Sequence, residues 1–209
     1  MHSTLEHWCG EADSETVHRL ADFVEWASPH ASRLGLTRYA EATEFARGLV
    51  APTLALFRPE LRHAVRTPVL DFGAGSGALG ITVALLWPAV RVTLADRRQR
   101  AVHFMELACA RFGIDNAEAY VRELALPPTP GDERYALVLL RAFAPTNHAL
   151  GMAIPWTASG GSIALWHRPP PPMSCGLELV HTSETTVSDL QLSVYRPDAE
   201  ASEGSQSIG

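Results

Sequence analysis

The feature that most constrains the fold of this chain is a glycine-rich stretch at residues 69–81, which reads Val-Leu-Asp-Phe-Gly-Ala-Gly-Ser-Gly-Ala-Leu-Gly-Ile. The apolar residues before the glycines predict a buried strand, and the apolar run at 78–87 predicts a helix. Glycine is needed where backbone approaches a ligand closely or takes a positive φ, and a helix start offers unpaired N–H groups. A strand, a glycine loop and a helix in this order build a nucleotide-type pocket at the carboxyl edge of an α/β sheet.

Two cofactors compete for this loop. Gly75, Gly77 and Gly80 match the G-x-G-x-x-G pattern of dinucleotide-binding folds. Asp71, however, lies in the strand just before the loop, where a carboxylate disfavours a pyrophosphate and favours a cationic ligand. S-adenosylmethionine, which carries an ammonium and a sulfonium, is such a ligand, and Asp-x-Gly-x-Gly-x-Gly is how class I methyltransferases begin. We therefore predict S-adenosylmethionine as the cofactor, with NAD as the minor alternative.

A second predicted strand, at 91–96, ends in Asp96. An acidic side chain about 20 residues after such a loop can hold a ribose, in NAD-binding folds as well as in methyltransferases. A helix is expected at 97–112, so Asp96 could instead serve only as a helix cap. The loop and Asp96 together favour the methyltransferase.

Strands and helices alternate after the glycine loop, which predicts an α/β fold with a Rossmann-like, mostly parallel sheet of the class I methyltransferase type. The last two strands are expected to pair as an antiparallel closing hairpin. The later strands are expected at 117–121, 135–140, 162–166, 177–187 and 190–195, with Gly160-Gly161 as a turn.

The chain is expected to contain three parts. Residues 1–62 should form an N-terminal helical cap packed on the sheet, 63–197 the S-adenosylmethionine-binding core, and 198–209 a disordered tail. Within the cap, apolar residues at helical spacing predict a first helix that ends at Ser28-Pro29, because the residue before a proline disfavours helical geometry.

Composition argues against several other classes of protein. The 209 residues include no apolar run of membrane-spanning length and no visible secretory signal, so we expect a cytoplasmic protein with no membrane contact. Cys9, Cys109 and Cys175 are far apart, and the histidines lack metal-ligand spacing, so we expect idle thiols and no metal. The net charge is −6 and all 17 basic residues are arginine, which argues against broad contact with nucleic acid.

Over residues 15–168 the sequence resembles the GidB-type enzymes. The resemblance rests on the loop from Asp71, on Asp96 and Arg122, and above all on the run Arg141-Ala-Phe-Ala-Pro145. These enzymes are bacterial S-adenosylmethionine-dependent methyltransferases that modify N7 of one guanine in 16S rRNA. The resemblance implies the same cofactor, the same reaction, and 16S rRNA or the small ribosomal subunit as the partner.

The resemblance also implies roles for individual residues. The loop backbone would hold the methionine end, Asp96 the ribose, and Glu123 and Leu124 would flank the adenine. Arg141 would lie beside the cofactor and the incoming base. The full set of expected cofactor contacts is Asp71, Gly73, Ala74, Gly75, Ala78, Asp96, Arg97, Glu123, Leu124 and Arg141.

No catalytic acid, base or nucleophile is expected. Guanine N7 already carries a free lone pair, so the task of the enzyme is positioning, and Arg141 is the nearest candidate for a catalytic role. A hydroxyl or amine acceptor would need a base, for which His148 and His167 are the candidates. Otherwise we expect both to be ordinary surface histidines.

Several substrate-side residues of the family are missing. Both asparagines of its Asn-x-x-x-Asn-Leu-Thr run are absent at 31–37, and its His-x-x-Asp-Ser falls on Leu49-Val-Ala-Pro52-Thr53. Its Leu-Lys-Gly run reads Leu165-Trp166-His167, without the lysine. Two alternatives therefore stay open: a divergent methyltransferase with a small-molecule or other RNA acceptor, and a non-catalytic binding module with the same fold.

Overall fold

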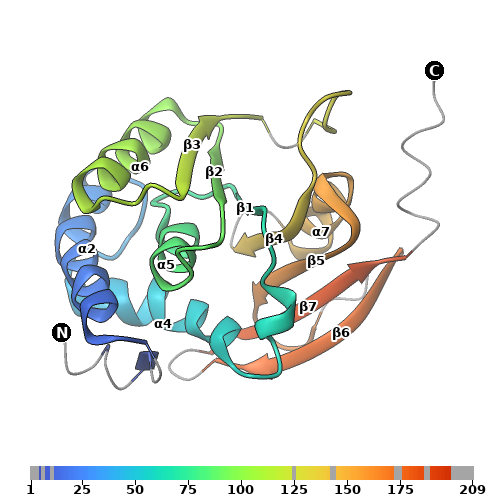
Figure 1. Ribbon diagram of the computed structural model, residues 1–209, viewed down its shortest axis with the longest axis horizontal. Coiled ribbons are helices and arrows are strands. Elements are labelled where there is room, and N and C mark those ends of the chain that lie inside the picture. Colours follow the sequence, from blue (N-terminus) through green and yellow to red (C-terminus); the bar gives the residue numbers. More distant parts are fainter. Residues whose placement is uncertain are drawn as a thin grey trace.

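The chain folds around one seven-stranded sheet with the strand order β3-β2-β1-β4-β5-β7-β6 (Figure 1). The computed structural model describes residues 5, 8–9, 12–123, 126–141, 145–171, 176–185 and 189–198. β1 to β5 run parallel, and β7 lies antiparallel between β5 and β6, which confirms the predicted fold class. The strands are β1 (Val69–Phe72), β2 (Val92–Asp96), β3 (Ala117–Val121), β4 (Tyr135–Arg141), β5 (Thr157–His167), β6 (Leu177–Glu184) and β7 (Gln191–Pro197).

Helices cover both faces of the sheet. The helix α5 packs on β1 and β2 and contacts α2, while α7 packs on β4 and β5 from the other face. Because α5 lies between the sheet and α2, it is apolar all round rather than amphipathic. The helices are α2 (Ser14–Arg33), α3 (Ala42–Phe45), the π-helix η1 (Ala46–Val50), α4 (Ala51–Thr53), the 3-10 helices η2 (Leu54–Phe57) and η3 (Arg62–Ala64), α5 (Ala78–Leu86), α6 (Gln99–Phe112), α7 (Thr146–Ala153) and the 3-10 helix η4 (Ile154–Trp156).

The chain leaves β1 in one direction to form β2 and β3, and then returns to form β4 on the other side of β1. In an open α/β sheet, the point where the strand order reverses opens a crevice at the carboxyl ends of the strands. The carboxyl ends of β1, β2 and β4 therefore mark where a ligand would bind.

The first helix does not end at Ser28-Pro29, so that prediction was wrong. α2 continues through Pro29 to Arg33. Proline disfavours a helix interior because it lacks an N–H, but Ser28 and Ala31 are buried on the same face as Val24 and Ala27. Burial of this continuing face outweighs the lost hydrogen bond.

Gly160 and Gly161 do not form a turn before the fifth strand, so that prediction was also wrong. β5 begins at Thr157, and the pairing of β4 with β5 shifts register between Tyr135 and Leu137. Gly160 has a φ of 67°, and a Cβ on Gly161 would lie 2.8 Å from the Ala158 carbonyl oxygen. The two glycines thus form an irregularity inside a longer strand.

Three further predictions concern the turn at Ser188-Asp189, the C-terminal tail and the division of the chain into a cap and a core. The predicted turn at Ser188-Asp189 lies partly outside the described residues, since 186–188 are not described. The predicted tail at 198–209 also lies outside them, apart from Asp198, whose N–H donates to the Gly176 carbonyl at 2.9 Å. The division into a cap at 1–62 and a core at 63–197 stays a prediction.

Candidate functional site

The glycine loop between β1 and α5 is shaped by left-handed backbone. Gly73, Gly75 and Gly77 have φ values of 75°, 61° and 70°, which side chains rarely tolerate. The N–H groups of Gly73 and Ala74 both donate to the Ala95 carbonyl at 2.9 Å, so the loop is fastened to the end of β2. Gly77 precedes α5, and no side chain caps the start of this helix. The loop therefore presents backbone at a helix start, the arrangement that the sequence predicted.

Asp71 is buried in the corner between β1 and α5. Its Oδ2 accepts a hydrogen bond of 2.8 Å from the backbone N–H of Gly80. A Cβ on Gly80 would lie 2.3 Å from Leu94 Cδ2 and 3.0 Å from Asp71 Oδ2, so α5 packs this closely only because residue 80 is glycine. Burial raises the pKa of Asp71 to about 7, opposed by the Gly80 N–H and by the charge of Arg141. A cationic ligand nearby would favour the ionised form.

Asp96 ends β2 and closes the loop from the other side. Its Oδ2 accepts from the Gly75 N–H at 2.9 Å. Its Oδ1 accepts from the Arg98 N–H at 2.9 Å, and the Arg98 guanidinium bonds both oxygens at 3.0 Å. Burial alone would raise the pKa of Asp96, but the hydrogen bonds from Arg98 and Gly75 outweigh it and hold the pKa below its ordinary value. Asp96 is therefore ionised at neutral pH.

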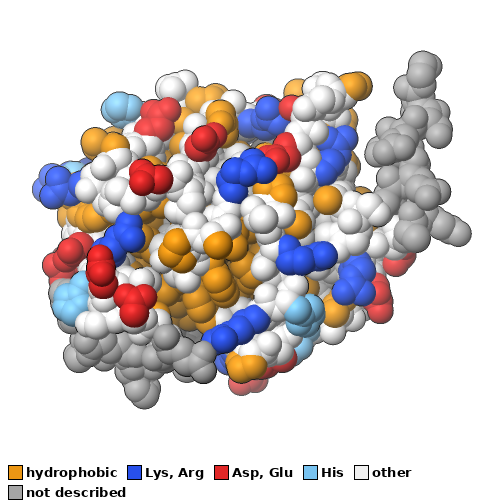
Figure 2. All heavy atoms as spheres, viewed as in Figure 1, with side chains coloured by type: hydrophobic (Ala, Val, Ile, Leu, Met, Phe, Trp, Pro, Cys, Tyr) orange, Lys and Arg blue, Asp and Glu red, His pale blue; other side chains and the backbone are white. Residues whose placement is uncertain are grey.

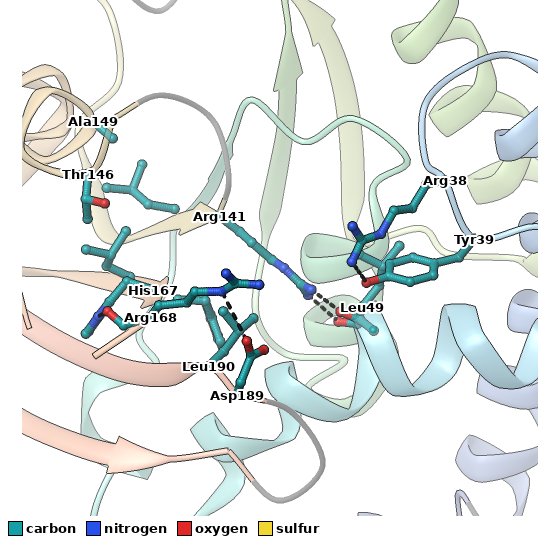
Figure 3. A pocket seen from close by; sticks show the side chains of 14 residues that line it. Arg38, Tyr39, Leu49, Arg141, Thr146, Ala149, His167, Arg168, Asp189 and Leu190 are labelled. Atoms are coloured by element: carbon teal, nitrogen blue, oxygen red, sulfur yellow. Dashed lines mark hydrogen bonds and ion pairs between the residues drawn. The ribbon is translucent and has the colours of Figure 1, made fainter. Parts of the chain in front are cut away.

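Arg141 ends β4 and reaches across to the helical segment before the sheet (Figure 3). Its Nη1 donates to the Leu49 carbonyl at 3.1 Å, and its Nη2 donates to the Gly48 carbonyl. Both carbonyls belong to the π-helix η1, a helix type often found at functional sites. Burial lowers the pKa of Arg141 to about 10, so it still carries its charge at neutral pH.

A pocket of about 500 Å³ opens at the carboxyl ends of β4 and β5 (Figure 3). Its walls combine arginines with apolar and aromatic side chains. It is lined by Arg38, Tyr39, Gly48, Leu49, Leu140, Arg141, Thr146, Ala149, Leu165, Trp166, His167, Arg168, Asp189 and Leu190. Asp189, the one carboxylate among the described lining residues, pairs with Arg168 at 3.1 Å.

His167 is buried rather than at the surface, so that expectation was wrong, whereas His148 is exposed as expected. The Nδ1 of His167 lies 2.8 Å from the Arg168 carbonyl, which can only accept, so this nitrogen carries the proton. In the neutral ring, Nε2 then accepts from the Ser193 hydroxyl at 2.8 Å. Both ring nitrogens are thus engaged, and His167 is poorly placed to act as a base.

The remaining expected cofactor contacts lie around the loop or outside the described residues. Ala78 is buried at the start of α5, whereas Arg97 and Glu123 are exposed. Leu124 and residues 142–144 of the Arg141 run lie outside the described residues.

Sequence reasoning missed two features of the site. Arg98, rather than its neighbour Arg97, is the arginine that pairs with Asp96. Tyr39 packs so closely on Gly48 that a Cβ there would lie 2.5 Å from the Tyr39 ring. The two-residue spacing of Asp96 and Arg98 could have indicated the first feature, but no local pattern indicates the second.

The part of the chain that the structure describes has no three His, Cys, Asp or Glu side chains close enough together to hold a metal ion. No helix in that part is long and apolar enough to cross a membrane. Cys9 and Cys109 are free thiols whose pKa values burial raises to about 11, so both are unreactive at neutral pH. Cys175 lies outside the described residues.

The strand order, the glycine loop and the carboxylate that ends β2 define a class I methyltransferase fold. The fold resembles a putative methyltransferase, yhhF, from Escherichia coli with a TM-score of 0.56 and 18% identity, covering 70% of this chain and 86% of that one. The chain belongs to the GidB family, described as rRNA small subunit methyltransferase G, whose model matches residues 16–167. Family membership confirms the predicted resemblance and makes S-adenosylmethionine the cofactor.

Curated relatives carry the name ribosomal RNA small subunit methyltransferase G. The protein from a Nocardioides species is 35% identical over 95 residues, which are 46% of this chain and 37% of that protein. The Thermotoga neapolitana protein is 32% identical over 111 residues, which are 52% of this chain and 48% of that protein. The Myxococcus xanthus protein is 28% identical over 145 residues, which are 69% of this chain and 64% of that protein. The chain thus spans less than half the length of the first two.

Proposed function

We propose that this chain transfers the methyl group of S-adenosylmethionine to N7 of a guanine in 16S rRNA. The observation that carries the proposal is the pocket at the ends of β4 and β5, where arginines line the space and no free base faces it among the described lining residues. Guanine N7 needs no base because its in-plane lone pair is unprotonated near neutral pH. Membership of a family described as rRNA methyltransferases supports the choice of acceptor.

The residues at the loop fit the proposed cofactor. Left-handed glycines bring backbone close to a ligand at the start of α5, Asp96 offers a carboxylate for the ribose, and the buried Asp71 favours a cationic ligand. The further proposed contacts are Gly73, Ala74, Gly75, Ala78, Arg97, Glu123, Leu124 and Arg141.

The proposed mechanism is positioning. When bound, S-adenosylmethionine supplies a methyl group on a positively charged sulfonium. Arg141, tied to the Gly48 and Leu49 carbonyls, holds the end of β4 against the helical segment and forms the wall that the acceptor meets. The apolar wall that includes Leu49 and Leu140 would exclude water, and the pocket walls would orient the acceptor nitrogen toward the methyl group that the cofactor supplies.

Charge distribution supports an RNA partner despite the net charge of −6. On the face seen in Figure 2, arginine side chains are more frequent over the half that carries β4 to β7, and acidic side chains over the half that carries α2 and α6. A local basic surface can bind phosphates even when the whole protein is acidic. A ribosomal acceptor would also place the protein in the cytoplasm.

A second candidate is methyl transfer to another acceptor. Two residues that line the pocket favour this candidate. Leu49 and Trp166 stand at positions where the pattern of the family has a histidine and a lysine. Such an acceptor would need a ready lone pair, for the same reason that guanine N7 does. An unprotonated ring nitrogen of a small heteroaromatic molecule has this chemistry.

The test uses purified protein, labelled S-adenosylmethionine and 30S subunits that lack the N7 methyl group. We expect label in 16S rRNA as N7-methylguanosine, detected by nuclease digestion and mass spectrometry. Cofactor binding measured by calorimetry without any transfer to 30S subunits would favour the second candidate. Absence of cofactor binding at protein concentrations far above a micromolar Kd would overturn both and favour a non-catalytic module.

A further inference from the structure

Every acceptor position of the Asp96 carboxylate is filled. An ionised carboxylate offers about four lone-pair positions. In Asp96 the Oδ1 accepts from the Arg98 backbone N–H and Nε, and the Oδ2 accepts from the Gly75 N–H and the Arg98 Nη2, at 2.9–3.0 Å. A ribose has two hydroxyl groups to donate, and no position is left for either.

Two of these four donors are backbone N–H groups, and two belong to one partly exposed side chain. The Gly75 and Arg98 N–H groups are fixed by the loop and by the start of α6, and the Asp96 side chain is only 5% exposed. The Arg98 side chain is 36% exposed, so its guanidinium can leave toward solvent without disturbing the fold. Its departure would free one position on each oxygen, which matches the two hydroxyls of a ribose.

The guanidinium also lies beside the glycine loop. A Cβ built on Gly75 would lie 3.6 Å from Arg98 Nη2 and 3.8 Å from the Leu36 carbonyl oxygen. Arg98 therefore fills the space between the loop and the segment that follows α2. A cofactor held by Gly75 and Asp96 would compete with Arg98 for space as well as for hydrogen bonds.

We infer that Arg98 occupies the ribose site of Asp96 in the free protein and must swing out before the cofactor binds. Arg98 is then a determinant of cofactor affinity that acts through Asp96. The inference rests on the proposed cofactor site. The product S-adenosylhomocysteine carries the same ribose, so the competition with Arg98 also favours its release.

The test compares wild-type protein with Arg98→Ala and Arg98→Gln in calorimetric titrations with S-adenosylhomocysteine. We expect both variants to bind about three- to tenfold more tightly, since a partly exposed ion pair no longer has to be broken. Arg100→Ala is the matched control, because it removes the same charge from an exposed position in the first turn of α6. This control should bind as the wild type does. Two variants at position 98 keep the test valid if one of them folds poorly.

A second pair of ligands separates competition at the ribose from a general effect on folding. Adenosine carries both ribose hydroxyls, whereas 2′,3′-dideoxyadenosine has neither. The Arg98 variants should bind adenosine more tightly than the wild type does, and should bind the dideoxy compound with the same affinity as the wild type. Equal or weaker binding of S-adenosylhomocysteine by both variants would overturn the inference while leaving the proposed function intact. If neither wild type nor variants bind, the proposed cofactor site and the inference both fail.

Discussion

The cofactor side and the acceptor side of this site are built differently. On the cofactor side, Asp71 bonds Gly80 nine residues away, and Asp96 bonds Gly75 across 21 residues. On the acceptor side, Arg141 bonds Leu49 and Gly48 across 92 and 93 residues. The first side is a local strand–loop–helix unit, whereas the second exists only after distant parts of the chain have packed together.

This difference indicates which side can diverge. Changing a residue of the local unit disturbs backbone geometry that any adenosyl ligand requires. The acceptor side is held by one arginine side chain, Arg141, on two helical carbonyls, and those contacts can be exchanged for others without altering the loop. The loss of family residues at Leu49 and Trp166, beside an intact glycine loop, fits this division.

The largest expected effect separates the two sides through Asp96. Asp96→Ala should weaken S-adenosylmethionine binding about 100-fold, because two charge-assisted hydrogen bonds of roughly 1.5 kcal/mol each are lost. Calorimetric titration measures this change. Asp132→Ala is a suitable control, since Asp132 also pairs with an arginine, Arg122, at 2.9 Å, but lies outside the expected cofactor contacts. A loss of affinity as small as that of the control would mean that Asp96 only fastens the glycine loop and does not bind the cofactor.

The cofactor side could be predicted from the sequence because the patterns that indicate it are local. The glycines after β1 and Asp96 at the end of β2 each follow from short-range rules, and each was predicted where the structure has it. Arg141 was also singled out, but through family resemblance rather than through its contacts. Gly48 and Tyr39 were not, because their packing depends on how the helical segment meets the sheet. No spacing within the chain encodes that contact.

The next effect tests the acceptor side through Arg141→Met. This change removes the buried charge and both guanidinium hydrogen bonds, although the Leu49 carbonyl keeps the hydrogen bond from the Thr53 hydroxyl, so the free energy of unfolding should fall by about 2 kcal/mol. Methyl transfer should fall further, while the affinity for S-adenosylmethionine changes less than in Asp96→Ala. Urea unfolding and single-turnover transfer measure the two quantities. An affinity loss as large as that of the Asp96 variant would show that Arg141 belongs to the cofactor side.

A smaller effect is expected from Gly48→Ala. The new Cβ would lie 2.5 Å from the Tyr39 ring, so the ring must move, at a cost of about 1–2 kcal/mol. The KM for the acceptor should rise while cofactor affinity is unchanged. Gly151→Ala in α7 is the matched control, because no atom lies within 4 Å of its new Cβ and alanine favours a helix by about 0.5–1 kcal/mol. If both variants are destabilised, the loss of stability comes from replacing a helical glycine and not from the contact with Tyr39.

The last effect is a pH dependence that links the two sides and is small over any one pH unit. In the folded protein the pKa of Asp71 is raised from 3.8 to about 7, chiefly by burial. Between these two values the folded state holds a proton that the unfolded state has lost, so the free energy of unfolding should fall as pH rises, by about 1 kcal/mol per pH unit. Above pH 7 the contribution is lost and the slope disappears. The opposite shift of Asp96 acts only below pH 4, because its pKa is lowered.

Asp71→Asn isolates this slope from the histidines that titrate in the same range. Asparagine can still accept the Gly80 N–H bond but cannot lose a proton, so the difference between wild type and variant should vary with pH only where Asp71 titrates. Because the charge of Arg141 lowers the pKa of Asp71, Arg141→Met should extend the sloping range to higher pH. Urea unfolding from pH 4.5 to 8.5 measures both effects. If Arg141→Met leaves the range unchanged, the two sides are electrostatically independent, and the acceptor side can diverge without changing the charge of the loop.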